Sequence, residues 1–126
     1  MRIVFSLTAA CGLAASLAGC ATTQVVTPKA APAGKLIKLA FYSDVRPNCA
    51  SNGPVSVRVV QGPGAGQLEF RDAVDFRPYT LACNMTRVSG VQVWYRGTVR
   101  AADRAVLEVT YPAHAARVET FDIQVR

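Results

Sequence analysis

The sequence predicts a small all-β domain in which about seven short strands form an antiparallel sandwich. Apolar residues recur at every second position from Lys35 to the end of the chain, which is the period of a half-buried strand. Turn-forming residues separate these runs, as at Asn52-Gly53-Pro54 and across residues 62–66. No long run of helical periodicity interrupts them, so two packed antiparallel sheets account best for the pattern.

Each predicted strand is a short run in which apolar and polar side chains alternate. One face of such a strand packs in the core while the other meets solvent, as antiparallel sheets allow. Because 126 residues leave room for one domain after a leader is removed, all the runs belong to a single domain, which we place at residues 35–126. The runs lie at residues 37–41, 55–59, 68–70, 81–85, 91–96, 105–111 and 121–125.

The first twenty residues have the pattern of a secretion signal. One positive charge, Arg2, precedes an uncharged apolar run over residues 3–18. The run is short for a membrane span, which needs about 20 apolar residues. It ends in Leu17-Ala18-Gly19-Cys20, which resembles the lipobox of bacterial lipoproteins.

The lipobox resemblance implies a cleaved signal peptide at residues 1–19 and a mature chain that begins with an acylated Cys20. Two or more acyl chains hold a protein on a membrane essentially permanently. Ala21 follows the cysteine where retention at the inner membrane usually uses Asp, so the resemblance implies the periplasmic face of the outer membrane. The alternative is an ordinary cleaved signal in which Cys20 is incidental.

Residues 20–34 comprise Cys20 and a segment of small, nearly uncharged residues, in which Pro28 and Pro32 discourage a helix. No sustained helical or alternating pattern is visible in this segment. We therefore predict that it is a flexible linker between the lipid anchor and the domain.

Cys49 and Cys83 are the cysteines left to pair once the leader is removed and Cys20 is acylated. An exported protein meets an oxidising compartment, so we predict a disulfide between them. The pattern places Cys83 on the apolar face of a strand beside Leu81 and Met85, so the bridge would attach the loop that carries Cys49 to the core. A redox or metal pair is the alternative, but the chain has no C-x-x-C motif and His114 is its single histidine.

Part of the predicted domain resembles the Ig-like and cadherin-like repeats of bacterial surface proteins. The resemblance rests on the stretch from Val57 to Gly66 and on the spacing of Val91, Val93, Tyr95 and Asp103. Ala102 stands where these repeats usually have Gly, and no aromatic residue follows Asp103. The resemblance implies an Ig-like fold with a role in adhesion or assembly.

The residues suggest no catalytic centre, metal or cofactor. No serine lies in a G-x-S-x-G motif, and His114 lies in a Pro/Ala turn that we expect to be solvated. The carboxylates Asp72 and Asp75 fit a polar loop better than a glycosidase pair, and the glycines at 62, 64 and 66 lead into a strand and not a helix. The formal net charge is +6, but the basic residues are spread along the chain, so we predict no nucleic-acid partner. They include Lys35, Arg46, Arg58, Arg71, Arg87, Arg96, Arg104 and Arg117.

Trp94 is the residue that suggests a binding surface. By parity it shares the solvent-facing side of its strand with Gln92 and Arg96, opposite Val91 and Val93. Trp and Arg are enriched among residues that dominate binding energy, so we predict a partner-binding site at Gln92, Trp94 and Arg96. Alternatively, this strand is central and both of its faces are covered.

Together these patterns favour a lipid-anchored envelope protein that acts as a non-enzymatic structural or protein-interaction module. Its expected partners are the membrane lipid, through acylated Cys20, and an envelope protein. A small periplasmic inhibitor of a lysozyme or a protease is the alternative, and an enzyme is a third.

Overall fold

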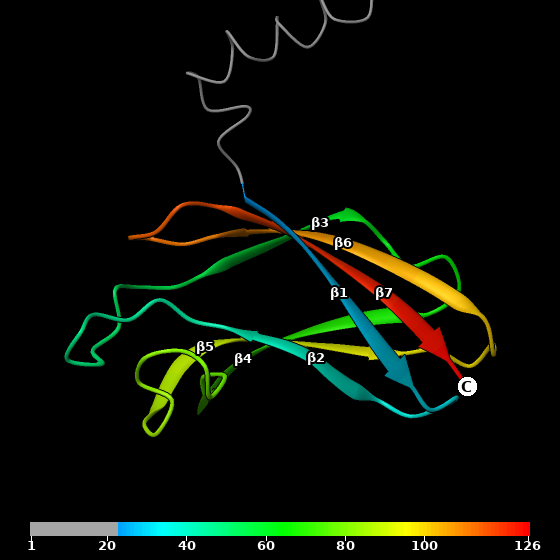
Figure 1. The fold of residues 1–126 in the computed structure, drawn as a ribbon, viewed down its shortest axis with the longest axis horizontal. Helices are drawn as coiled ribbons and strands as arrows, with labels where there is room; N and C mark the ends of the chain where they lie inside the picture. The colour runs from blue at the N-terminus through cyan, green and yellow to red at the C-terminus, as the bar shows by residue number, and fades with distance from the viewer. Residues whose placement is uncertain (1–22) are drawn as a thin grey trace, which may run out of the picture.

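The computed structural model describes residues 23–126, which form two facing β-sheets (Figure 1). The four-stranded sheet has the order β1-β7-β6-β3, and the three-stranded sheet has the order β2-β5-β4. The prediction of an all-β sandwich of seven strands is therefore confirmed. The strands are β1 (Thr23–Ala31), β2 (Ile37–Tyr42), β3 (Ser56–Gln61), β4 (Gln67–Phe76), β5 (Arg87–Arg96), β6 (Ala102–Thr110) and β7 (Arg117–Val125).

Strand β1 corrects the prediction that residues 20–34 form a flexible linker. It pairs with β7 from Thr23 opposite Arg117 to Ala31 opposite Val125. This pairing is parallel, so the sandwich is not wholly antiparallel as predicted. The folded domain begins at Thr23 and not at Lys35, while residues 20–22 of the predicted linker lie outside the described residues.

The linker prediction was wrong because proline was treated as evidence against regular structure. Pro28 lies inside β1, and β1 is the outer strand of its sheet. An outer strand tolerates proline where its missing N–H would have faced away from the neighbouring strand. Val25 and Thr27 are half-buried and Ala31 is fully buried, so alternate residues of β1 face the core even though the segment is not strongly apolar.

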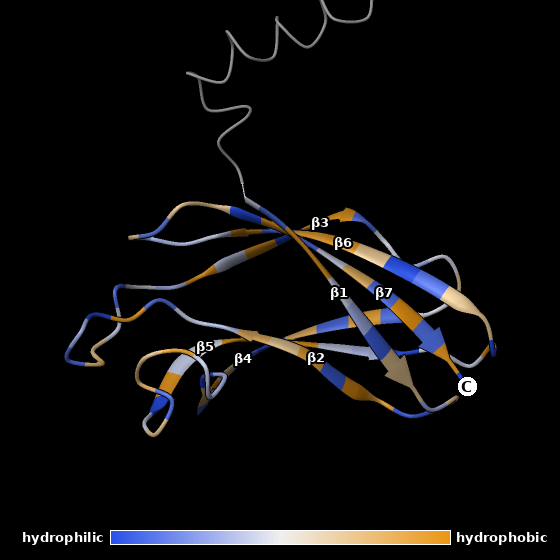
Figure 2. Ribbon diagram, in the orientation of Figure 1, coloured by the Kyte–Doolittle hydropathy of each residue, from blue (hydrophilic) through white to orange (hydrophobic). Residues whose placement is uncertain are grey.

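The core lies between the two sheets and is built from the alternate residues that the sequence pattern marks as apolar. Figure 2 shows the alternation of hydrophobic and hydrophilic residues along the strands. Val93 and Tyr95 of β5 are completely buried, as predicted from their parity. They pack with Leu107 and Val109 of β6 and with alternate residues of β7, namely Phe121, Ile123 and Val125.

A register shift in β2 changes which of its side chains reach the core. The shift lies between Lys38 and Ala40, so Phe41 pairs with Gln92 and shares its outward direction. Phe41 is buried but is not part of the core cluster, unlike Leu39. Its ring lies over Gly90, where an added Cβ would come within 2.8 Å of it and 2.2 Å of the Tyr42 carbonyl oxygen. A side chain at position 90 would therefore separate β2 from β5.

The strand predicted at residues 81–85 is absent; these residues lie in the loop between β4 and β5. Leu81 and Met85 are exposed, and Cys83 adopts a positive φ of 63° in a turn. Apolar and polar residues therefore alternate over these five positions although no neighbouring strand pairs with them. The predicted number of strands holds because β1 takes the place of this one.

Candidate functional site

The disulfide between Cys49 and Cys83 is formed, as predicted. It joins the loop after β2 to the β4–β5 loop, and the two Cα atoms are 5.6 Å apart. The prediction that it attaches a loop to the core was wrong, because both cysteines lie in turns with positive φ. The bridge instead fixes two surface loops to each other at one end of the sandwich.

The predicted binding residues Gln92, Trp94 and Arg96 lie together on the outer face of the three-stranded sheet, on its central strand β5. Arg96 is exposed, whereas Gln92 and Trp94 are half-buried. The Trp94 indole Nε1 donates a hydrogen bond to Gln92 Oε1 at 3.0 Å. The guanidinium of Arg71 lies 4.8 Å from the indole centroid, a distance at which a cation is attracted to the ring face.

The end of the β4–β5 hairpin curls over this outer face. Asp75 pairs with Val88 in the register, whereas Gln92 pairs with Arg71 four positions further on. Gln92 Nε2 nevertheless donates to Asp75 Oδ2 at 3.0 Å, and Lys38 Nζ lies 2.6 Å from the same oxygen. Only a bent hairpin brings these groups together, and Figure 1 shows its loop end turning away from the four-stranded sheet.

The same contacts control the charge of Asp75. The hydrogen bond from Lys38 is the largest effect and lowers the pKa of this carboxyl, and burial partly opposes it. The backbone N–H of Phe76 and the Gln92 amide lower the pKa further. The Asp75 carboxylate is therefore held in its ionised form by Lys38 and Gln92, beside the Trp94 surface.

A cleft of about 880 Å³ opens between the outer strands β1 and β2. At its base the Tyr42 hydroxyl donates to Glu119 Oε1 at 3.1 Å, and Arg117 Nη2 lies 3.3 Å from Glu119 Oε2. Burial is the main cause that raises the pKa of Tyr42, and the Glu119 charge adds to it. Both oxygens of the carboxylate are thus occupied by protein groups.

Asp44 is a buried acid that the sequence analysis did not select. Its carboxylate accepts hydrogen bonds from Asn52 Nδ2 at 2.9 Å and from the Ala113 N–H at 2.7 Å. His114 Nδ1 lies 2.6 Å from Asp44 Oδ1, while most of the imidazole stays exposed. Burial alone would raise the pKa of Asp44, but these hydrogen bonds outweigh it and lower the pKa. No pattern of polar residues in the sequence indicates this contact, because it joins residues 70 positions apart.

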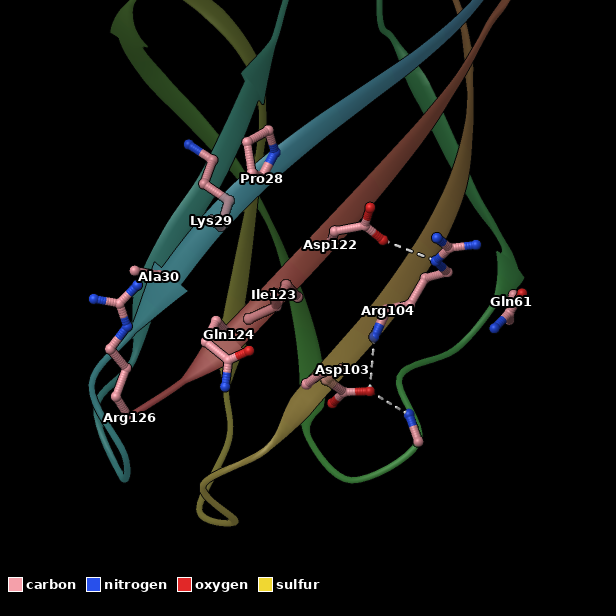
Figure 3. A pocket seen from close by; sticks show the side chains of 12 residues that line it. Pro28, Lys29, Ala30, Gln61, Asp103, Arg104, Asp122, Ile123, Gln124 and Arg126 are labelled. Atoms are coloured by element: carbon pink, nitrogen blue, oxygen red, sulfur yellow. Dashed lines mark hydrogen bonds and ion pairs between the residues drawn. The ribbon is translucent and has the colours of Figure 1, made fainter.

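A shallow hollow of about 780 Å³ covers the outer face of the four-stranded sheet (Figure 3). Arg104 Nε lies 2.8 Å from Asp122 Oδ1, and Lys29 and Arg126 line the hollow as well. Asp103 accepts hydrogen bonds from the N–H groups of Gly64 and Gly66 at 2.7 and 2.9 Å. Asp103 therefore holds the β3–β4 loop in place.

Residues 23–126 contain neither a cluster of metal ligands nor a membrane-crossing helix. No group of three or more His, Cys, Asp and Glu side chains in this part of the chain is arranged to hold a metal ion. Nor do these residues include a helix of the length and hydrophobicity that a membrane crossing requires. The signal peptide and the predicted lipidation site Cys20 lie outside the described residues.

Comparison with known proteins gives little beyond the fold. No protein-family model and no curated protein matches the chain. Among solved structures, the chain is similar to the solution structure of amebosin, with 12% identity and a TM-score of 0.44. That similarity covers 83% of this chain and 98% of amebosin. It is too loose to bear on function.

Proposed function

We propose that the protein is a lipid-anchored lipoprotein of the bacterial cell envelope that binds a protein partner and catalyses no reaction. Its anchor is acylated Cys20, and its expected location is the periplasmic face of the outer membrane. The observation that carries this proposal is the Leu17-Ala18-Gly19-Cys20 motif at the end of an apolar run. A formed disulfide, which oxidising compartments favour, is consistent with export.

The partner-binding surface in this proposal is the outer face of the three-stranded sheet around Trp94. The indole is oriented by Gln92 and covered on one side by Arg71, so its position is fixed before a partner arrives. A prepositioned aromatic side chain loses little conformational freedom on binding. Arg96 is exposed next to it on the same strand and face. This combination is typical of residues that dominate the energy of an interface.

We also propose that the sandwich is of the Ig-like kind. The elements that carry the resemblance, Tyr95 and Asp103, contact each other: the tyrosine hydroxyl donates to Asp103 Oδ2 at 2.7 Å. Gly66, at the end of the first element, lies against the Tyr95 ring, since an added Cβ would come within 2.3 Å of it. The two parts of the pattern therefore contact each other, which supports the proposal.

Mass spectrometry of the mature N-terminus tests the anchor. We expect cleavage before Cys20 and a diacylglyceryl thioether on its sulfur, and we expect labelled palmitate to be incorporated in living cells. A Cys20→Ser variant is the matched control and should take up no label. An unmodified N-terminal peptide from the wild-type protein would contradict the proposal.

Co-purification from detergent extracts tests the binding surface. We expect Trp94→Ala to weaken partner capture by about 30-fold, the size of a typical dominant interface residue. Because Trp94 is half-buried, Arg96→Glu provides a second variant at an exposed position, and Arg104→Glu on the other sheet is the control. An equal loss of partner capture in all three variants would contradict the assignment of binding to this surface. Slowing of a lysozyme or a protease by the purified protein would support the inhibitor alternative instead.

A further inference from the structure

Exposed apolar side chains are concentrated at the curled end of the β4–β5 hairpin. We define the hairpin tip as residues 74–87, which comprise the end of β4, the loop and the first residue of β5. Tyr79 is 88% exposed and Met85 is 87% exposed. Five of the ten large apolar residues exposed among residues 23–126 belong to this tip, and they are Val74, Phe76, Tyr79, Leu81 and Met85. This surface is costly in water, so its concentration in one place points to a contact.

The hairpin tip is held in shape by its own contacts. Asn84 Nδ2 donates to the carbonyl oxygens of Tyr79 and Leu81, at 2.9 and 2.7 Å. Arg77 Nη1 donates to the Ala82 carbonyl oxygen at 2.6 Å, and the disulfide fixes Cys83 from the other side. The apolar side chains are therefore presented by an ordered loop, which reduces the entropy lost when the loop binds a surface.

The charge of the tip is positive. Arg77 and Arg87 lie within it, and its one acidic residue, Asp75, is paired with Lys38. Arg46 lies in the loop that the disulfide attaches to the tip. Arginines beside exposed aromatic and aliphatic side chains match a membrane surface, where anionic headgroups border the acyl chains.

The position of the tip relative to the anchor favours the same surface. Only Ala21 and Thr22 separate Cys20 from the start of β1 at Thr23. Thr23 and Leu81 line the same cleft, so the start of β1 and the hairpin tip lie at one end of the sandwich. Three peptide units span about 10 Å, which leaves the acylated residue little reach away from this end.

We propose that the hairpin tip rests in the interface of the anionic membrane that holds the lipid anchor. Tyr79, Leu81 and Met85 enter the boundary between headgroups and acyl chains, while Arg77 and Arg87 contact the phosphates. The domain is thereby held in one orientation, with the opposite end of the sandwich directed to the periplasm. This inference rests on the proposed lipid anchor.

Site-directed fluorescence tests this orientation in the mature lipoprotein. Trp94 is the single tryptophan, so Trp94→Phe gives a silent background in which Tyr79→Trp reports on the tip. Each protein is purified in its acylated form and reconstituted into vesicles of phosphatidylethanolamine and phosphatidylglycerol with brominated acyl chains. Val99→Trp is the matched control, because Val99 is exposed in the loop at the opposite end of the sandwich.

We expect the Tyr79→Trp emission to fall roughly twofold or more, because side chains of interfacial segments lie about 5–10 Å deep. Emission from Val99→Trp should not change. Met85→Trp provides a second reporter if Tyr79→Trp unfolds, and unfolding is checked by circular dichroism before reconstitution.

The outcomes separate this inference from the proposed anchor. Protein that fails to float with the vesicles would show that the anchor proposal is wrong. Protein that floats while both tip reporters remain as bright as Val99→Trp would overturn the membrane contact and leave the anchor intact. Tip reporters that change only when an envelope extract is added would also overturn it, in favour of a protein partner at the tip.

Discussion

At the scale of single residues, the buried carboxylate of Asp44 joins two loops. Its carboxylate connects its own loop, through Asn52, to the turn between β6 and β7, through Ala113 and His114. The Asn52 N–H also donates to the Asp44 carbonyl oxygen at 2.9 Å. One buried charge thus organises two loops at the end of the sandwich where β1 begins.

We expect Asp44→Asn to destabilise the domain by roughly 1–3 kcal/mol at neutral pH, because the new amide places a donor against donors in a buried site. The folded pKa of Asp44 is lowered, so its ionised form contributes stability above the unfolded value near 4 and loses it as the pH falls through the folded value. Urea unfolding at neutral pH and at about pH 3 should therefore show the gap between wild type and variant closing in acid. A gap of equal size at both pH values would exclude this role.

The sequence pattern predicts residues well where burial depends on parity alone. Val91, Val93 and Tyr95 were assigned to the core, and each is buried. The alternation over residues 37–41 predicts that Phe41 and Leu39 face the core together. The register shift in β2 instead places their side chains on opposite faces of the sheet. Such shifts depend on neighbouring strands and on Gly90, so they cannot be predicted from the alternation in one strand.

At the scale of elements, β1 is where the sequence reading failed most. Its partner β7 lies at the other end of the chain, and a parallel pair has no turn between its strands to signal it. The strand wrongly predicted at residues 81–85 has the same cause. Alternating apolar residues favour a strand, but a strand forms only where a neighbouring strand can pair with it. The predicted binding residues Gln92, Trp94 and Arg96 do lie on one face, but the curled hairpin beside them was not predicted.

Proline substitutions in β1 test its pairing. Pro28 indicates that even-numbered positions direct their N–H groups to solvent, so odd-numbered positions bond to β7. We expect Thr27→Pro to cost roughly 1–3 kcal/mol more than Val26→Pro, because only the first removes a hydrogen bond to β7. Denaturant unfolding of both variants measures the difference, and equal costs would show that β1 does not pair in this register.

At the scale of the whole molecule, the disulfide acts on the unfolded chain. It links residues 34 positions apart and joins the loop that crosses between the sheets to a hairpin within one sheet. Closing such a loop removes conformations that the unfolded chain would otherwise sample. Because a small domain has a limited core, this contribution is a large part of its stability.

We expect the Cys49→Ser, Cys83→Ser double variant to lose roughly 2–4 kcal/mol of unfolding free energy. The measurement is urea unfolding without reductant, and wild-type protein treated with reductant should match the double variant. A double variant as stable as the oxidised wild type would show that the loops are held by other contacts.

The arrangement of β1 also determines how the domain carries mechanical load. The chain enters this strand pair at Thr23, while β7 ends at Val125 at the far end of the same pair. A pull between the two termini therefore slides β1 along β7 and strains the hydrogen bonds of all nine residue pairs at once. Peeling would break them one after another under a much smaller force. If the proposed anchor at Cys20 holds, the domain resists tension along the axis from that anchor to the end of β7.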